Sequence, residues 1–443
     1  MQISLSDHFT FKRLIRFVMP SVIMMIVTSL YSIVDGIFVS NIVGKNAFAA
    51  VNLVMPVLMA LGSIGFLVGT GGSAIVAKTL GEGKKQKANE YFSMLIKTVI
   101  IVGVFLSVIG FIFMPQIAKA LGASKVIFND CVTYGRILLC ANTFFMLQNS
   151  FQSFLVVAEK PLFGLFISIC AGVCNMLLDF LFMYVFDFGI AGAAFATAIS
   201  QVIGGVIPLI FFFIHKNKSQ IQLINAKIDF RVLKKACANG SSETVTNLSM
   251  SLASMLYNMQ LMKLANENGI AAYGVIMYVA FIFAAIYIGY SIGSSPITSY
   301  NYGSGNHAEL KNVFRKSLII ITIVSICMLA ASQLAATTLA GIFVSYDKEL
   351  FDLTVNGFKL YSLSFLFSGF NIFSSAFFTA LNNGLISAVI SFLRTLVFQV
   401  SAVFILPLLI GVNGIWLAVV AAEILTLIFS VIFLITNRKK YHY

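Results

Sequence analysis

The sequence is dominated by long apolar runs separated by short polar stretches. Each run reaches or exceeds the roughly 20 apolar residues with which a helix crosses the hydrocarbon core of a bilayer. None shows the strand-length alternation of a membrane β-barrel. The runs predict an all-α polytopic membrane protein with twelve transmembrane helices, near residues 14–40, 48–78, 91–116, 127–158, 161–186, 189–214, 237–264, 271–301, 314–341, 350–381, 386–411 and 413–436.

The composition excludes the main soluble classes. Hydrophobic residues make up 59% of the 443 residues and charged residues only 10%, against about 45–50% and about 25% in soluble globular proteins. So little charge cannot cover the surface of a soluble fold. A soluble enzyme and a secreted disulfide scaffold are therefore excluded. The six cysteines lie in or beside apolar runs, and we interpret them as small core residues rather than metal ligands.

The net charge of +13 reflects membrane topology. Of the 29 Lys and Arg residues, 20 lie on the side of the predicted spans that carries both termini, and 5 lie on the opposite side. Because basic residues concentrate in cytoplasmic loops, both termini are predicted to be cytoplasmic. The basic excess then needs no nucleic-acid partner.

The chain divides into two similar halves. The longest polar stretch predicts a cytoplasmic linker at 215–235 between an N-terminal six-helix lobe, 1–214, and a C-terminal six-helix lobe, 236–443. Motifs recur at an offset of 222 residues: Gly189-Ile-Ala-Gly192 matches Gly411-Val-Asn-Gly414, and Gly81-Glu-Gly83 matches Gly303-Ser-Gly305. Six spans separate the copies, so the two lobes have the same orientation and form a parallel repeat. Such repeats occur in transporters whose lobes rock about a central site.

Acidic residues are rare inside the predicted spans. An unpaired carboxylate there costs at least ~2.5–3.5 kcal/mol, which makes each one a candidate functional residue. At the 222-residue offset, the two acids of the first lobe have no acidic counterpart. Of the 16 acidic residues, four lie within spans: Asp35, Asp179, Glu243 and Glu423.

A candidate ion site follows from the neighbours of the first two acids. Asn175 and Asp179 are four residues apart and share a helical face, and Thr197 lies about one turn into the next span. Asp35 shares its span with Pro20, which removes a backbone hydrogen bond and can bend the helix. Two carboxylates, an amide and a hydroxyl suit a monovalent cation or a proton shared between carboxylates. A structural hydrogen-bond network is the alternative.

These residues carry a resemblance to a known family. The chain resembles the multidrug and toxic compound extrusion (MATE) transporters of the bacterial type over nearly its whole length. The motifs that carry the resemblance are Pro20 with Asp35 in VDGIFVSNIVG, the Asn175-Met-Leu-Leu-Asp179 pair, and Thr197 in GIAGAAFATA. The resemblance implies a first-lobe cation site made by the following residues: Asp35, Asn175, Asp179, Thr197, the backbone carbonyl of Ala193, and Tyr134. Gln152 stands where an Asn is common in the family.

The resemblance also implies a function. Such a protein exports organic cations and other amphipathic compounds in exchange for H⁺ or Na⁺, by alternating access. We expect a monomer in a bacterial plasma membrane, with no cofactor and no metal other than Na⁺. A Walker motif is absent and the four His do not cluster with acids, so neither an ATP-driven pump nor an enzyme is predicted. The alternative is a flippase for a lipid-linked or other amphipathic precursor of the same superfamily.

The second lobe departs from family members that have acidic residues in both the seventh and tenth helices. Arg394 lies mid-span and requires a partner, for which Glu423 or Glu243 is the natural choice. We interpret the pair as structural, with a gating or coupling role as the alternative. Tyrosine, methionine and amide residues concentrate in this lobe and predict a wall of the substrate cavity, with ordinary packing as the alternative. They are Tyr257, Gln260, Tyr273, Met277, Tyr278, Tyr287, Tyr290 and Asn371.

Overall fold

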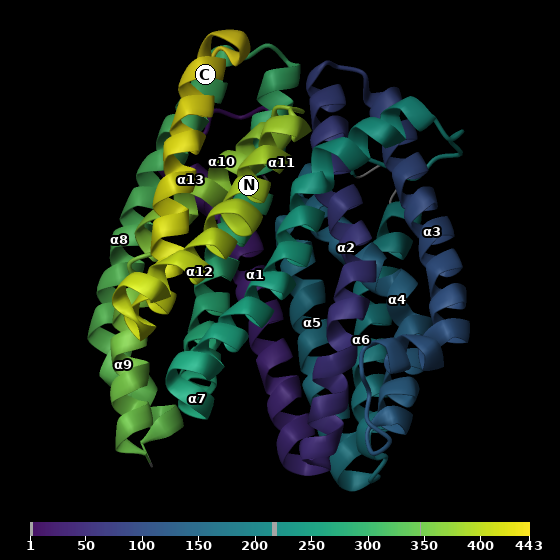
Figure 1. Ribbon diagram of the computed structural model, residues 1–443. Helices are drawn as coiled ribbons and strands as arrows, with labels where there is room; N and C mark the ends of the chain where they lie inside the picture. Colours follow the sequence, from purple (N-terminus) through teal and green to yellow (C-terminus); the bar gives the residue numbers. More distant parts are fainter. Residues whose placement is uncertain (1–2, 215–218, 346) are drawn as a thin grey trace.

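The computed structural model describes residues 3–214, 219–345 and 347–443 and, in that part of the chain, consists of helices joined by short loops. Residues 215–218 of the predicted linker lie outside the described residues. Figure 1 shows two helical bundles side by side, with the first half of the chain in one and the second half in the other. The first contains α1 (Phe11–Phe38), α2 (Lys45–Gly81), α3 (Lys85–Ala120), α4 (Phe128–Val157), α5 (Pro161–Asp179) and α6 (Gly189–Ile214). The second contains α7 (Phe230–Gly303), α8 (His307–Val344), α9 (Lys348–Ser362), α10 (Phe365–Ala380), α11 (Gly384–Phe392), α12 (Gln399–Ile410) and α13 (Val412–Tyr441).

Local sequence sets where the helices begin and end. The side chains of Asp229, Asn306 and Asp347 accept hydrogen bonds from the first backbone N–H groups of α7, α8 and α9, which would otherwise lack a partner. Gly83 and Gly305 follow the ends of α2 and α7 with φ of 75° and 70°, a conformation that glycine adopts without a steric penalty. The two glycines are equivalent at the 222-residue offset.

The helices correspond to twelve membrane spans. The long helix α7 is two spans that meet at Asn266, whose φ of 51° and ψ of −146° break the helix, inside the predicted interval between 264 and 271. Helices α9 and α10 meet at 46° and form one bent span. Helices α11 and α12 form another, joined by a π-helical turn at Leu393–Phe398. The twelve-helix, two-lobe fold is therefore confirmed.

The two lobes touch through backbone at symmetry-equivalent positions. A Cβ atom on Gly81 would overlap the carbonyl oxygen of Tyr300, and one on Gly303 would overlap the carbonyl oxygen of Lys78. The two contacts are related by the same 222-residue offset. Only glycine permits so close an approach, and the contacts join the end of α2 to the end of α7.

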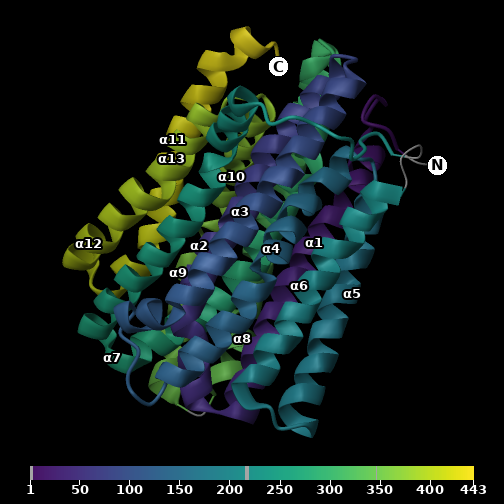
Figure 2. The same ribbon diagram turned by 90° about the vertical axis from the view of Figure 1, so that its right-hand side faces the viewer.

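The N-terminal segment links the two lobes at the same end of the molecule. The carboxylate of Glu159, between α4 and α5, accepts a hydrogen bond of 2.8 Å from the backbone N–H of Leu5. The carboxylate of Glu309, at the start of α8, accepts one of 2.8 Å from the N–H of Phe9 and lies 2.6 Å from Nδ1 of His8. The ribbons approach one another near the C-terminus and diverge toward the opposite end (Figure 1), and Figure 2 shows both termini at one end.

Candidate ion and substrate site

A cavity of about 210 Å³ lies inside the first lobe. It brings together three residues of the predicted ion site, Asp35 from α1, Asn175 from α5 and Thr197 from α6. Asn175 Nδ2 donates a long hydrogen bond of 3.5 Å to Thr197 Oγ1. The other lining residues are Thr28, Tyr31, Ser32, Met55, Leu58, Met59, Phe66, Leu138, Asn142, Phe145, Gln148, Asn149, Ser200 and Gln201.

The remaining predicted ligands are buried near this cavity. Asp179, Tyr134 and Ala193 have no exposed surface, and Asp35 is only 7% exposed. The charge of Asp35 acts on Asp179, and the charges of both carboxylates act on Tyr134. The structure therefore brings the two acids and Tyr134 into one electrostatic cluster.

Several oxygens of this cluster have no hydrogen-bond donor from the protein. Within the described residues, Oδ1 of Asn175 and the hydroxyl of Tyr134 are buried without a hydrogen bond. The carboxyl groups of Asp35 and Asp179 lie within hydrogen-bonding reach of each other, and their buried oxygens have no other partner among these residues. Buried polar atoms without a partner are rare because desolvation costs about 1–3 kcal/mol each. A proton or a Na⁺ ion would satisfy them. The described residues contain no group of three or more His, Cys, Asp or Glu placed to hold a metal ion.

π-Helical turns lie beside or around three charged residues inside the spans, Asp35, Asp179 and Arg394. Helix α5 ends at Asp179 and continues as a π-helical turn, Phe180–Val185. Helix α1 passes Asp35 and continues as a π-helical turn, Val39–Val43, and Arg394 lies inside the turn that joins α11 to α12. Such turns interrupt the regular hydrogen-bond ladder and occur frequently at functional sites.

Sequence reasoning missed the contribution of α4. Asn142, Gln148 and Asn149 line the cavity, and the Nδ2 atoms of Asn142 and Asn149 are buried without a partner among the residues described. The spacing of seven between the two asparagines inside an apolar span was a usable signal, because it places both amides on one helical face. Gln152 is buried further along α4, with an unpartnered Oε1, and is not a lining residue of the cavity.

In the second lobe, Arg394 is paired with Glu423. Nη2 and Nε of Arg394 lie 2.7 Å and 2.8 Å from Oε1 of Glu423. The other carboxylate oxygen accepts a hydrogen bond of 2.7 Å from Nδ2 of Asn371. Glu243 is affected by the charge of Arg394 but forms no salt bridge with it. Of the two candidates, Glu423 is therefore the direct partner.

Three residues predicted for the substrate cavity are bonded inside the second lobe. Tyr287 donates a 2.8 Å hydrogen bond to the carbonyl of Phe365, and Tyr290 donates one of 2.8 Å to Oγ of Ser317. The amide of Asn371 is engaged by Glu423. These bonds account for the burial of the three side chains, and their place in a cavity wall stays a prediction.

The other residues of that prediction have mixed surroundings. The rings of Tyr257 and Tyr273 are stacked with centroids 5.0 Å apart and are nearly fully buried. Sδ of Met277 accepts a contact of 3.9 Å from the hydroxyl of Tyr361. Gln260 is half-buried and Tyr278 is exposed. A cavity wall formed by these residues stays a prediction.

Two similar six-helix lobes, with buried carboxylates inside the spans, define a membrane transporter. The model of the MatE family matches the chain twice, over residues 20–181 and 244–405, once in each lobe. The chain belongs to the MatE family, and the resemblance inferred from its motifs is confirmed.

Individual relatives cover nearly the whole chain. Multidrug export protein MepA of Staphylococcus aureus (strain MRSA252) is 22% identical over 93% of this chain and 91% of that protein. MepA of Staphylococcus saprophyticus is 24% identical over 93% and 91%. The crystal structure of MATE in complex with MaL6 superposes with a TM-score of 0.92 at 22% identity, covering 98% of both chains. A MATE family transporter of the MOP superfamily in an outward-facing conformation also has a TM-score of 0.92, at 22% identity, covering 98% of this chain and 97% of that chain. These structures share the fold.

Proposed function

We propose that the protein is a secondary active antiporter that exports organic cations and other amphipathic drugs in exchange for H⁺ or Na⁺. The observation that carries the proposal is the pair of buried carboxyl groups, Asp35 and Asp179, which lie within hydrogen-bonding reach of each other beside a cavity in the first lobe. Relatives named multidrug export protein support export as the direction of transport. The coupling ion binds at this pair, with Tyr134, Asn175 and the backbone of the neighbouring helix as further ligands.

Helix α1 connects the proposed ion site to the contact between the lobes. Asp35 lies near one end of α1, and nearer the other end Val18 and Val22 pack directly on Gly293 and Gly289 of α7. A change of charge at Asp35 therefore acts on the helix that also forms the inter-lobe contact. In the proposed cycle, binding of the ion neutralises a buried charge and allows α1 to repack.

Pro20 lies between the two inter-lobe contacts of α1 and supplies its weak point. A proline inside a helix removes one backbone hydrogen bond, so bending there is less costly than elsewhere in the helix. Contact between the lobes at the end that carries the termini supports an outward-facing state, with that end cytoplasmic. The bias of Lys and Arg toward this end supports the same orientation in a bacterial plasma membrane.

The energy of one coupling ion is sufficient for drug export. One monovalent ion crossing 100 mV releases ~2.3 kcal/mol, and a tenfold concentration gradient adds about 1.4 kcal/mol. Together they support a gradient of a few hundredfold for a neutral drug, and a smaller one for a cationic drug because the charges offset. The proposed cycle needs no cofactor and can operate in a monomer.

The test is transport in proteoliposomes with an imposed pH or Na⁺ gradient. Asp35→Asn and Asp179→Asn are compared with wild type and with Asp187→Asn, an exposed acid in the loop before α6 of the same lobe. We expect gradient-driven transport to fall to background in the first two variants and to stay at the wild-type level in the third. Unchanged transport in both site variants would refute the ion site.

The same experiment identifies the coupling ion. Collapsing the pH gradient with a protonophore, in Na⁺-free buffer, abolishes transport if H⁺ is coupled. Collapsing an imposed Na⁺ gradient with a sodium ionophore, at equal pH on both sides, abolishes it if Na⁺ is coupled. Transport that survives loss of both gradients would exclude antiport with either ion.

A further inference from the structure

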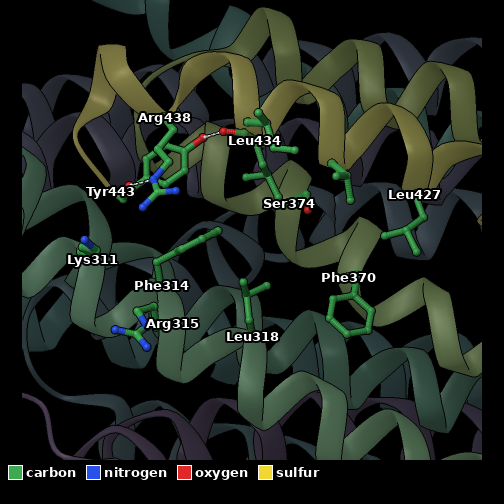
Figure 3. A pocket seen from close by; sticks show the side chains of 12 residues that line it. Lys311, Phe314, Arg315, Leu318, Phe370, Ser374, Leu427, Leu434, Arg438 and Tyr443 are labelled. Carbon is green, nitrogen blue, oxygen red and sulfur yellow. Dashed lines mark hydrogen bonds between the residues drawn. The ribbon is translucent and has the colours of Figure 1, made fainter.

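A groove of about 640 Å³ lies on the second lobe, away from the first-lobe cavity. It runs between α8 and α13, and α10 packs against both of these helices. Figure 3 shows its lining side chains directed into the space between the helices. The lining residues are Lys311, Phe314, Arg315, Leu318, Phe370, Ser374, Leu427, Val431, Leu434, Ile435, Arg438 and Tyr443.

Charge is confined to one end of this groove. Lys311 and Arg315 are one turn apart on α8, and Arg438 faces them from the last turn of α13 (Figure 3). None of the lining residues is acidic. The salt bridges found among residues 3–214, 219–345 and 347–443 involve none of the three. The Nε of Arg438 donates a hydrogen bond of 3.2 Å to the carbonyl of Tyr443.

The rest of the groove is apolar and long. Leu427 precedes Arg438 by three turns on α13, which is about 16 Å along a helix. Over this length the exposed side chains of Val431 and Ile435 form one wall, and Phe370 lies toward the far end (Figure 3). The groove therefore has a cationic end at the level of the chain termini and an apolar channel that extends into the depth of the membrane.

The ring of Tyr443 closes the groove behind its cationic end. It packs on Phe314 and Phe377, with centroids 4.9 Å away in both cases. Its hydroxyl donates a 2.7 Å hydrogen bond to the carbonyl of Leu434. The exposed side chains of Lys311, Arg315 and Arg438 therefore lie beside a packed aromatic wall.

We propose that this groove binds an anionic glycerophospholipid. The phosphate contacts Lys311, Arg315 and Arg438, and an acyl chain follows the apolar channel. Basic pockets between spans recognise anionic head groups in this way. Charge complementarity also excludes an organic cation as the occupant, because three positive side chains would repel it. The inference concerns a site separate from the proposed ion site and does not depend on antiport.

The test measures lipid binding to the purified full-length protein by native mass spectrometry. The probes are phosphatidylglycerol and phosphatidylcholine with the same acyl chains, added at equal concentration. Lys311→Gln/Arg315→Gln is compared with Lys85→Gln/Lys87→Gln, which removes two exposed positive charges at the start of α3. Val431→Trp fills the channel without changing its charge. A parallel series adds inorganic phosphate to the lipid-bound wild type.

We expect wild type to prefer phosphatidylglycerol and the groove variant to bind it about 20- to 30-fold more weakly. The α3 variant should keep the wild-type preference, Val431→Trp should lower binding of both lipids, and phosphate should displace neither. Equal preference in wild type and groove variant overturns the site. If the α3 variant loses phosphatidylglycerol binding to the same extent, the effect is one of general charge and the proposed site is overturned. Displacement by phosphate would show a site for free phosphate instead of lipid.

Discussion

The buried pair of Arg394 and Glu423 allows a quantitative prediction. Replacing Arg394 with Met leaves the carboxylate of Glu423, which is 3% exposed, with only its hydrogen bond to Asn371. Removing one partner of a buried ion pair typically costs about 3–5 kcal/mol. We therefore expect Arg394→Met to lower the free energy of unfolding by about 3–5 kcal/mol at pH 7.

A second substitution separates the lost ion pair from the buried charge. In Arg394→Met/Glu423→Gln no charge is buried, and the glutamine oxygen can still accept from Asn371. Replacing both partners of a buried ion pair is often close to neutral, so the double variant should unfold within about 1.5 kcal/mol of wild type.

The assay is reversible unfolding in mixed micelles with increasing dodecyl sulfate. Trp416 is the only tryptophan, is fully buried, and lies on α13 with Glu423, so its fluorescence reports on the helix under test. A loss below about 1 kcal/mol in Arg394→Met, or an equal loss in the double variant, would refute the reasoning. A double variant that is stable but inactive in transport would assign the pair a coupling role instead of a structural one.

Two further predictions concern the end where the lobes meet. Gly303→Ala should lower the free energy of unfolding by about 1–3 kcal/mol, because its methyl group meets a backbone carbonyl of α2. The control, Gly274→Ala, has open space at its Cβ and should be neutral or more stable by up to about 1 kcal/mol. Equal losses in the two variants would contradict the close contact at Gly303. Glu309→Ala should speed hydrogen–deuterium exchange at the Phe9 amide by at least tenfold, measured by mass spectrometry of N-terminal peptides, and Glu349→Ala at the start of α9 should not. Unchanged exchange in Glu309→Ala would show that the bond does not hold the segment.

The sequence predicted the spans and the repeat because both depend on local chemistry. Apolar length defines a membrane helix without reference to its neighbours, so even the break near Asn266 was expected from the interruption of one apolar run. The offset of 222 residues is a property of the chain and reappears as the paired contacts of Gly81 and Gly303. The grouping of Asp35 with Tyr134 required the family resemblance in addition to spacing.

What the sequence left open depends on contacts between distant segments. Arg394 had two acidic candidates, and only the packing of α13 against the π-helical turn selects Glu423. The type of Tyr287 suggested a cavity wall, but its hydrogen bond to a carbonyl group of α10 could not be read from the sequence. The amides of α4 face the first-lobe cavity because residues of α1, α2, α5 and α6 line its other sides, an arrangement that no single segment encodes.

The N-terminal segment has a consequence for the order of assembly. His8 leaves the ribosome well before its partner Glu309, which is 301 residues later. Membrane proteins are inserted as they are synthesised, and earlier parts generally fold first. The segment can reach Glu159 after four spans have been made, but it cannot bridge the lobes until α8 has begun. The contacts of the N-terminal segment that join the lobes are therefore completed late in biosynthesis. Until the second lobe has been made, these contacts cannot hold the first lobe in the joined arrangement.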